Sequence, residues 1–169
     1  MLKIINNLEP FFEDCYRRIN VREYAKILHI SPPTASKLLA AYHTQNLLKK
    51  ETYRRYILYY ADKESHDFID LSRIYWRRRI KGLMGHIEER LARPTLVLFG
   101  SLAKAEVKPD SDLDLAIFGQ KKELDLTGFE KQLKRKIQVF WFNSLQEISN
   151  RELANNVLNG YTLKGRLSL

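Results

Sequence analysis

The sequence predicts an α+β protein with two folded parts and a helical connector between them. Near the N-terminus, two apolar stripes at helical spacing precede a run of strand-forming residues. Towards the C-terminus, short apolar runs alternate with turns and helical stretches, as expected for a small mixed sheet. We therefore divide the chain into residues 1–63, a connector over residues 64–93, and residues 94–169.

Charge and cysteine content limit the class of protein. The chain of 169 residues has a net charge of +9, and residues 1–63 hold 11 Lys/Arg against 6 Asp/Glu. This excess favours a polyanionic partner such as nucleic acid. The single cysteine, Cys15, is expected in a helix core. One cysteine cannot form an intrachain disulfide, which is consistent with a reducing cytoplasm. The N-terminus is too polar for a signal peptide and no apolar run reaches membrane-spanning length, so we expect a soluble cytoplasmic protein.

Residues 20–44 have the capping and turn residues expected of two helices joined by a tight turn. Asn20 is a helix cap with Glu23 three residues later, as in a capping box. His29 and Ile30 make the turn, and Ser31 caps a second helix that has two prolines in its first turn. The residues expected to face the core are Val21, Tyr24, Ala25, Leu28, Ala35, Leu38, Leu39 and Tyr42.

Residues 47–60 predict a β-hairpin with a basic tip that carries Lys49, Lys50, Arg54 and Arg55. Together with the preceding helices, and above all over residues 21–39, the pattern resembles the winged-helix domains of prokaryotic and archaeal transcription regulators. The resemblance implies binding to duplex DNA through the outward side of the second helix and the hairpin. The alternative is a winged helix that serves only dimerisation or protein contact. The candidate DNA-binding residues are Ser31, Thr34, Ser36, Lys37, Lys49, Lys50, Arg54 and Arg55, and His43 is also expected to point outward.

The connector predicts one long helix from about residue 65 to residue 92, ending before Pro94. Arg77, Arg78 and Arg79 occupy successive positions, so on a regular helix they fan around the axis and form no single basic face. The apolar stripe of this helix consists of Leu71, Ile74, Tyr75, Ile80, Leu83, Met84, Ile87 and Leu91.

The most informative motif is Gly100-Ser101, ten residues, then Asp112-Leu113-Asp114, with an apolar strand pattern on each side. Side chains alternate along a strand, so Asp112 and Asp114 project from one face and can share divalent metal. The glycine turn lets backbone approach a ligand closely.

This motif resembles the minimal nucleotidyltransferase family of the DNA polymerase β superfamily, over roughly residues 93 to 165. The resemblance implies that Gly100 and Ser101 bind the triphosphate of ATP or another nucleoside triphosphate. It also implies that Asp112 and Asp114 are catalytic and hold Mg²⁺, with up to two ions. Lys104 and Ser111 are further candidate phosphate contacts. The family commonly has Arg-Gly where this chain has Lys104 and Ala105.

The family usually adds a third carboxylate from a later strand, as metal ligand and base. The matching strand here is residues 136–142, and alternation places Gln138 at that position. We therefore keep two readings, a working enzyme and an inactive relative. After this strand, residues 144–158 predict a helix with Leu145, Ile148, Leu153 and Val157 inward, and residues 161–165 resemble the family's closing strand.

The function expected from both resemblances is Mg²⁺-dependent transfer of a nucleotidyl group, in the first instance AMP from ATP, to a hydroxyl of a protein or small molecule. Some members of the family are antitoxins that modify HEPN toxins, which implies a HEPN-type partner protein and autoregulation through DNA binding. A homodimer is compatible with this reading. The alternative is a transcription regulator whose nucleotidyltransferase-like domain only senses a nucleotide.

Overall fold

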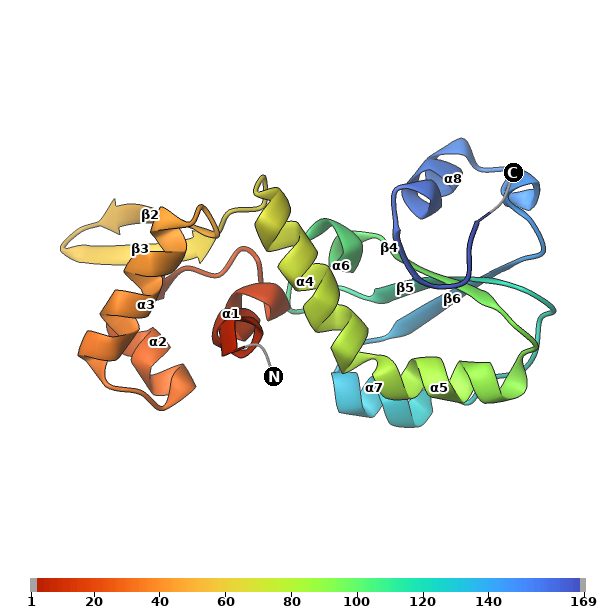
Figure 1. Ribbon diagram of the computed structural model, residues 1–169, viewed down its shortest axis with the longest axis horizontal. Coiled ribbons are helices and arrows are strands. Elements are labelled where there is room, and N and C mark those ends of the chain that lie inside the picture. The colour runs from red at the N-terminus through yellow and green to blue at the C-terminus, as the bar shows by residue number, and fades with distance from the viewer. Residues whose placement is uncertain (1–2, 168–169) are drawn as a thin grey trace. The chain divides into compact units, whose positions relative to one another are not determined.

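The computed structural model describes residues 3–167 (Figure 1). The chain divides into two compact units: Met1–Tyr75 with Ala105–Pro109, and Trp76–Lys104 with Asp110–Leu169. The outer ends of the predicted segments, residues 1, 2, 168 and 169, lie outside the described residues. The α+β class is confirmed, with eight α-helices and two small sheets in the described part of the chain. No helix within residues 3–167 is long and apolar enough to cross a bilayer.

The first unit is a helical layer against a three-stranded antiparallel sheet of order β1-β3-β2. Its core consists largely of buried aromatic and aliphatic side chains, among them Phe11, Phe12, Tyr24 and Leu39. The elements are α1 (Lys3–Glu13), β1 (Ile19–Asn20), α2 (Val21–Leu28), α3 (Pro32–Thr44), β2 (Leu48–Tyr53), β3 (Tyr56–Ala61) and the start of α4 (His66–Arg79).

The predicted caps and turn of the helix pair are confirmed. The Asn20 side chain accepts hydrogen bonds from the backbone N–H groups of Arg22 and Glu23, and Ser31 accepts one from Thr34. His29 adopts φ 54°, the left-handed conformation that ends α2. Local hydrogen-bonding residues thus determine where both helices begin.

Three predictions for this unit are wrong in detail. Cys15 is buried, but in the turn after α1 rather than in a helix, where its N–H donates to Val107 O at 2.8 Å. His43 does not point freely outward, because its Nδ1 is hydrogen-bonded to Leu48 O at 2.9 Å and the residue is half-buried. Lys49 and Lys50 lie opposite Tyr60 and Tyr59, in the half of the hairpin near its open end, and not at its tip. The sequence pattern does not specify how the two strands of the hairpin are paired. The two-residue turn at Arg54 determines this register.

The predicted connector helix is two helices, α4 (His66–Arg79) and α5 (Lys81–Arg90), separated at Ile80. Ile80 is buried and has φ −97° and ψ 11°, so burial of this side chain accompanies the break. Ile74 is 37% exposed, although it belongs to the predicted stripe, whereas Trp76 is completely buried. Helical periodicity read through a break assigns the wrong residues to the core.

The second unit contains a four-stranded mixed sheet of order β6-β5-β4-β7, in which only β5 and β6 are parallel. The predicted small mixed sheet is therefore confirmed. The predicted helix over residues 144–158 is instead a short 3₁₀ helix and a separate α-helix, joined by an extended link around Ile148. The elements are β4 (Thr95–Phe99), α6 (Ser101–Lys104), β5 (Leu113–Phe118), α7 (Thr127–Leu133), β6 (Ile137–Phe142), η1 (Leu145–Glu147), α8 (Arg151–Leu158) and β7 (Tyr161–Lys164).

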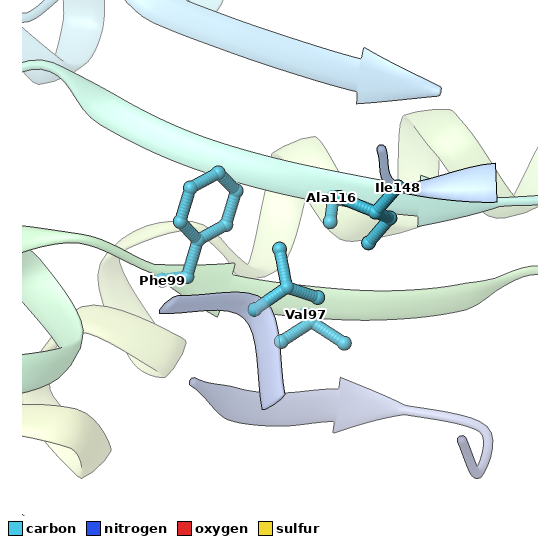
Figure 2. Close-up of a cluster of buried hydrophobic side chains, with 5 residues drawn as sticks. Val97, Phe99, Ala116 and Ile148 are labelled. Atoms are coloured by element: carbon cyan, nitrogen blue, oxygen red, sulfur yellow. The ribbon is translucent and has the colours of Figure 1, made fainter. Parts of the chain in front are cut away.

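Helices cover both faces of this sheet: α8 lies on one side, and α5 with α7 lies on the other (Figure 1). Figure 2 shows the cluster under α8, where Val97 and Phe99 of β4 meet Ala116 of β5 and Ile148. Val157 of α8 completes this cluster and is fully buried. The cluster fixes the strands that carry the polar residues described next.

Candidate functional site

Strand register brings the predicted metal-binding residues and Gln138 together. Asp114 of β5 pairs with Phe99 of β4 on one side and with Gln138 of β6 on the other. Asp112 lies two residues before Asp114 and therefore on the same face, directly before β5 begins. Two carboxylates and one carboxamide thus gather at one end of the sheet face that α8 covers.

The turn at Gly100 is built against Asp114. Gly100 adopts φ 71°, and a Cβ on this residue would overlap the Asp114 Oδ2 atom. Glycine is required there both by the backbone conformation and by the space. Ser101 follows as the first residue of α6 and is half-buried, so the two nucleotide-binding candidates of the turn lie beside the carboxylates.

Gln138 contacts the carboxylate pair directly. Its Nε2 donates a hydrogen bond to Asp112 Oδ2 at 2.5 Å. The amide therefore orients Asp112, and its carbonyl oxygen would be at most a neutral donor to a hard cation. The predicted position of Gln138 at the place of a third carboxylate agrees with this geometry.

The two aspartates disfavour each other's charge. Asp114 is half-buried, and desolvation, followed by repulsion from Asp112, raises the pKa of its carboxyl above the ordinary value. A divalent cation between them would remove this repulsion, and carboxylate oxygens are the ligands that Mg²⁺ prefers. The residues present therefore fit a metal ion, with Asp112 and Asp114 as its charged ligands. Within residues 3–167 no group of three or more His, Cys, Asp or Glu side chains is arranged to hold a metal.

Ser111 is held by a residue that the sequence analysis missed. Arg135 is 7% exposed, donates from Nη1 to Ser111 O at 2.8 Å, and places its guanidinium 5.0 Å from the ring centre of Trp76. The run Lys134-Arg135-Lys136 suggests solvated charges, and only strand alternation back from Ile137 signals that Arg135 points inward. Arg135 fixes the loop that leads into Asp112.

Lys104 also has a partner that was missed. Its Nζ donates to Asn156 Oδ1 of α8 at 2.7 Å, so in this structure the ammonium group is directed to α8. The next residue, Ala105, has φ 55°. This conformation suits the glycine that the resembling family commonly has at that position.

The candidate DNA-binding residues of the first unit lie on α3 and the β2–β3 hairpin. Thr34, Ser36 and Lys37 are exposed, and Ser31 shares a 2.8 Å hydrogen bond with the Thr34 hydroxyl. On the hairpin Lys50, Arg54 and Arg55 are exposed, as predicted.

Lys49 is engaged elsewhere. Its Nζ lies 2.6 Å from Glu64 and 3.1 Å from Asp62, and these hydrogen bonds, Glu64 first, raise the pKa of Lys49. Tyr53 and Tyr56, which are not among the predicted DNA-binding residues, flank the hairpin turn and are 58% and 48% exposed. Exposed aromatic side chains beside arginines are a recognisable signal for nucleic-acid contact.

Comparison with known families agrees with the geometry of the second unit. Residues 88–166 match the family described as "Polymerase beta, Nucleotidyltransferase". The match supports the polymerase β superfamily. This nucleotidyltransferase segment contains Gly100, Ser101, Asp112, Asp114 and Gln138, and the family indicates nucleotidyl transfer as the general class of reaction. No curated protein and no solved structure matches the chain significantly.

Proposed function

We propose that the nucleotidyltransferase segment catalyses Mg²⁺-dependent transfer of AMP from ATP to a hydroxyl group of a protein or small molecule. The single observation that carries this proposal is the joining of Asp112, Asp114 and Gln138 on adjacent strands beside the Gly100 turn. The family match supports the reaction class.

Asp112 and Asp114 would hold Mg²⁺, which when bound neutralises charge on the triphosphate and on the leaving pyrophosphate. The chain's own residues orient the reactants. Gly100 leaves the backbone open for close approach of phosphate, and the Ser101 hydroxyl offers a donor beside it. Gln138 fixes Asp112 through its amide N–H. Lys104 and Ser111 remain candidate phosphate contacts, and Lys104 would have to leave Asn156 for this role.

The test is transfer of label from ATP labelled in its α-phosphate to a candidate acceptor, with and without Mg²⁺. Asp112→Asn with Asp114→Asn should abolish both transfer and Mg²⁺-dependent ATP binding, because the neutral side-chain amides of asparagine cannot compensate the charge of divalent cations. Asp110→Asn is the matched control, since this exposed carboxylate lies in the same loop. If the double variant still binds ATP with unchanged Mg²⁺ dependence, the motif is only a structural turn.

Gln138 separates an active enzyme from the alternative, a transcription regulator that only senses a nucleotide. Gln138→Asp supplies a third carboxylate at a position in contact with Asp112, and general-base help contributes about 10²- to 10⁴-fold. Single-turnover transfer that rises in this variant indicates a wild-type enzyme slowed by the missing base. ATP binding without transfer in both proteins supports the sensor.

For the first unit we propose a winged-helix domain that binds duplex DNA. The order α1-β1-α2-α3-β2-β3 and the exposed Lys37, Arg54 and Arg55 support this. Together with the family resemblance, DNA binding by this domain supports an antitoxin-type regulator whose partner is a HEPN-type protein. We propose that this regulator acts in the cytoplasm as a homodimer on its own operator.

DNA binding is tested on the full chain with duplex DNA over a range of salt concentrations. Lys50→Ala with Arg54→Ala should weaken binding to all sequences and reduce the log–log salt slope by about 1.8, or 0.9 per lost phosphate contact. Lys121→Ala with Lys131→Ala, two exposed lysines of the second unit, is the matched control. Equal salt slopes in the two variants would contradict the hairpin assignment.

A further inference from the structure

Three cations lie on one side of the α4–α5 segment, because Arg77, Arg78 and Lys81 have the i, i+1 and i+4 spacing of a single helix face. Within the second unit, the side chains around Ile80 line a hollow of about 370 Å³. Cationic residues line one part of it, and a thioether and a glycine line the rest. Its lining consists of Arg77, Arg78, Lys81, Met84, Gly85 and Glu88.

The positive charge of this hollow is not compensated. Among residues 3–167, no side chain forms an ion pair or hydrogen bond with the side chains of Arg77, Arg78 or Lys81, and all three residues are exposed. Glu88, the one acidic residue of the lining, is paired with Lys164. Unpaired like charges in one concave surface attract polyanions.

The positive surface continues beyond Glu88. A neighbouring hollow of about 250 Å³ shares Glu88 and adds Arg93 and Lys164 to the lining. We use the name basic trough for the two hollows together. Its five cations, Arg77, Arg78, Lys81, Arg93 and Lys164, face one carboxylate.

We propose that the basic trough binds a single strand of nucleic acid through its phosphates, without reading its sequence. Arginine guanidinium groups bind phosphate oxygens in pairs, and Lys81 adds a point charge. Apart from Glu88, the lining of the first hollow has no carboxylate, amide or hydroxyl side chain that would form a base-specific hydrogen bond. The cations line two adjoining hollows of about 370 and 250 Å³, and a flexible single strand can follow such a concave surface more readily than a stiff duplex.

The basic trough is separate from the carboxylate site. The carboxylates lie on the sheet face under α8, while α5 lies on the other side of the sheet (Figure 1). Binding in the basic trough is therefore an interaction of its own, which neither requires nor blocks ATP binding at Asp112 and Asp114.

The test is fluorescence anisotropy of a labelled 12-residue oligothymidylate with the full chain. All proteins carry Lys50→Ala and Arg54→Ala, so that the hairpin of the first unit does not dominate binding. Arg77→Glu with Arg78→Glu should weaken binding at least tenfold and reduce the log–log salt slope by about 1.4, because single strands lose about 0.7 per phosphate contact. Lys121→Glu with Lys131→Glu changes the net charge equally elsewhere in the second unit and should change the affinity less than threefold.

Gly85→Leu tests the hollow without changing its charge. A Cβ at Gly85 meets no atom within 4 Å, and leucine favours a helix more than glycine does, so the variant should fold while filling the hollow. We expect this variant to lower the affinity for oligothymidylate at least fivefold and to leave Mg²⁺-dependent ATP binding unchanged.

Three results would overturn the proposal. An equal loss of oligothymidylate affinity in Arg77→Glu with Arg78→Glu and in Lys121→Glu with Lys131→Glu would show that only net charge attracts the strand. Unchanged binding by Gly85→Leu would show that the hollow is not used. Competition by duplex DNA as strong as that by single strand, per phosphate, would show a duplex surface. Loss of ATP binding by Asp112→Asn with Asp114→Asn tests the proposed enzyme separately.

Discussion

The two ends of one sheet face differ in chemistry although the same strands build them. At one end Asp112, Asp114 and Gln138 stand together, and at the other Ala116 lies under Ile148. Asp114 and Ala116 are only two residues apart on β5. The comparison teaches that the apolar end fixes the backbone, so that the polar end can hold two carboxylates against their mutual repulsion.

The largest expected change in stability is at the apolar end. Ile148→Ala removes a side chain that is 8% exposed and should lower the free energy of unfolding by about 2–3 kcal/mol. Mg²⁺-dependent ATP affinity should stay within twofold below the unfolding temperature, because Ile148 does not belong to the polar end. Chemical denaturation and calorimetry measure the two quantities. Leu158→Ala, at a residue 52% exposed, is the control and should change stability by less than about 0.5 kcal/mol. A large loss of ATP affinity in Ile148→Ala would break the division between the ends.

At the polar end, Gly100→Ala should affect ATP binding more than stability, the opposite of Ile148→Ala. The left-handed conformation costs about 1–2 kcal/mol with a Cβ, and that Cβ would push Asp114 aside. We expect complete loss of Mg²⁺-dependent ATP binding with a moderate loss of stability, measured by the same two methods. Gly128→Ala in α7, where a Cβ meets no atom within 4 Å, should bind ATP normally and be no less stable. Normal ATP binding by Gly100→Ala would remove the turn from the site.

A smaller effect is expected at the contact between Gln138 and Asp112. Gln138→Leu removes the 2.5 Å hydrogen bond, and because Gln138 is exposed the loss of stability should stay below about 1 kcal/mol. ATP affinity in Mg²⁺ should fall severalfold, since Asp112 loses its orienting partner. Gln132→Leu, at an exposed residue of α7, is the matched control for isothermal titration. Equal affinities in the two variants would show that Gln138 does not position Asp112.

The smallest effect is the pH dependence of stability at Asp114, measured in EDTA. Burial and then Asp112 raise the pKa of this carboxyl above 3.8, so the stability that it contributes is complete below pH 3.8 and is lost as pH rises through the folded-state pKa. Asp114→Asn cannot lose a proton and should gain stability relative to wild type over that range.

Asp125 provides a control of opposite sign. The backbone N–H of Thr127, then its side chain, lowers the pKa of Asp125, so the contribution of this carboxylate is present above pH 3.8 and disappears as pH falls. Asp125→Asn should therefore lose stability relative to wild type at neutral pH. Parallel pH profiles for wild type and Asp114→Asn would contradict repulsion at the polar end.

Much of this arrangement could be predicted from sequence because it depends on short-range chemistry. The caps at Asn20 and Ser31, the turn at His29 and the alternation that pairs Asp112 with Asp114 involve neighbouring residues. Strand alternation also located Gln138 correctly, since β6 is regular over Ile137–Phe142. The role of Arg135 could not be predicted, because its burial depends on Trp76 and Ser111, far away in the chain.

By itself, the sequence determined the α+β class, the helix starts and the identity of the paired carboxylates, because capping, turns and periodicity act over a few residues. Only the tertiary structure decided where Lys49 and Lys104 find their partners, that the connector breaks at Ile80, and that a hollow lies beside Arg77, Arg78 and Lys81. The physical reason is that these contacts, and the burial of side chains such as Ile80, depend on residues that are distant in sequence, which local periodicity does not report.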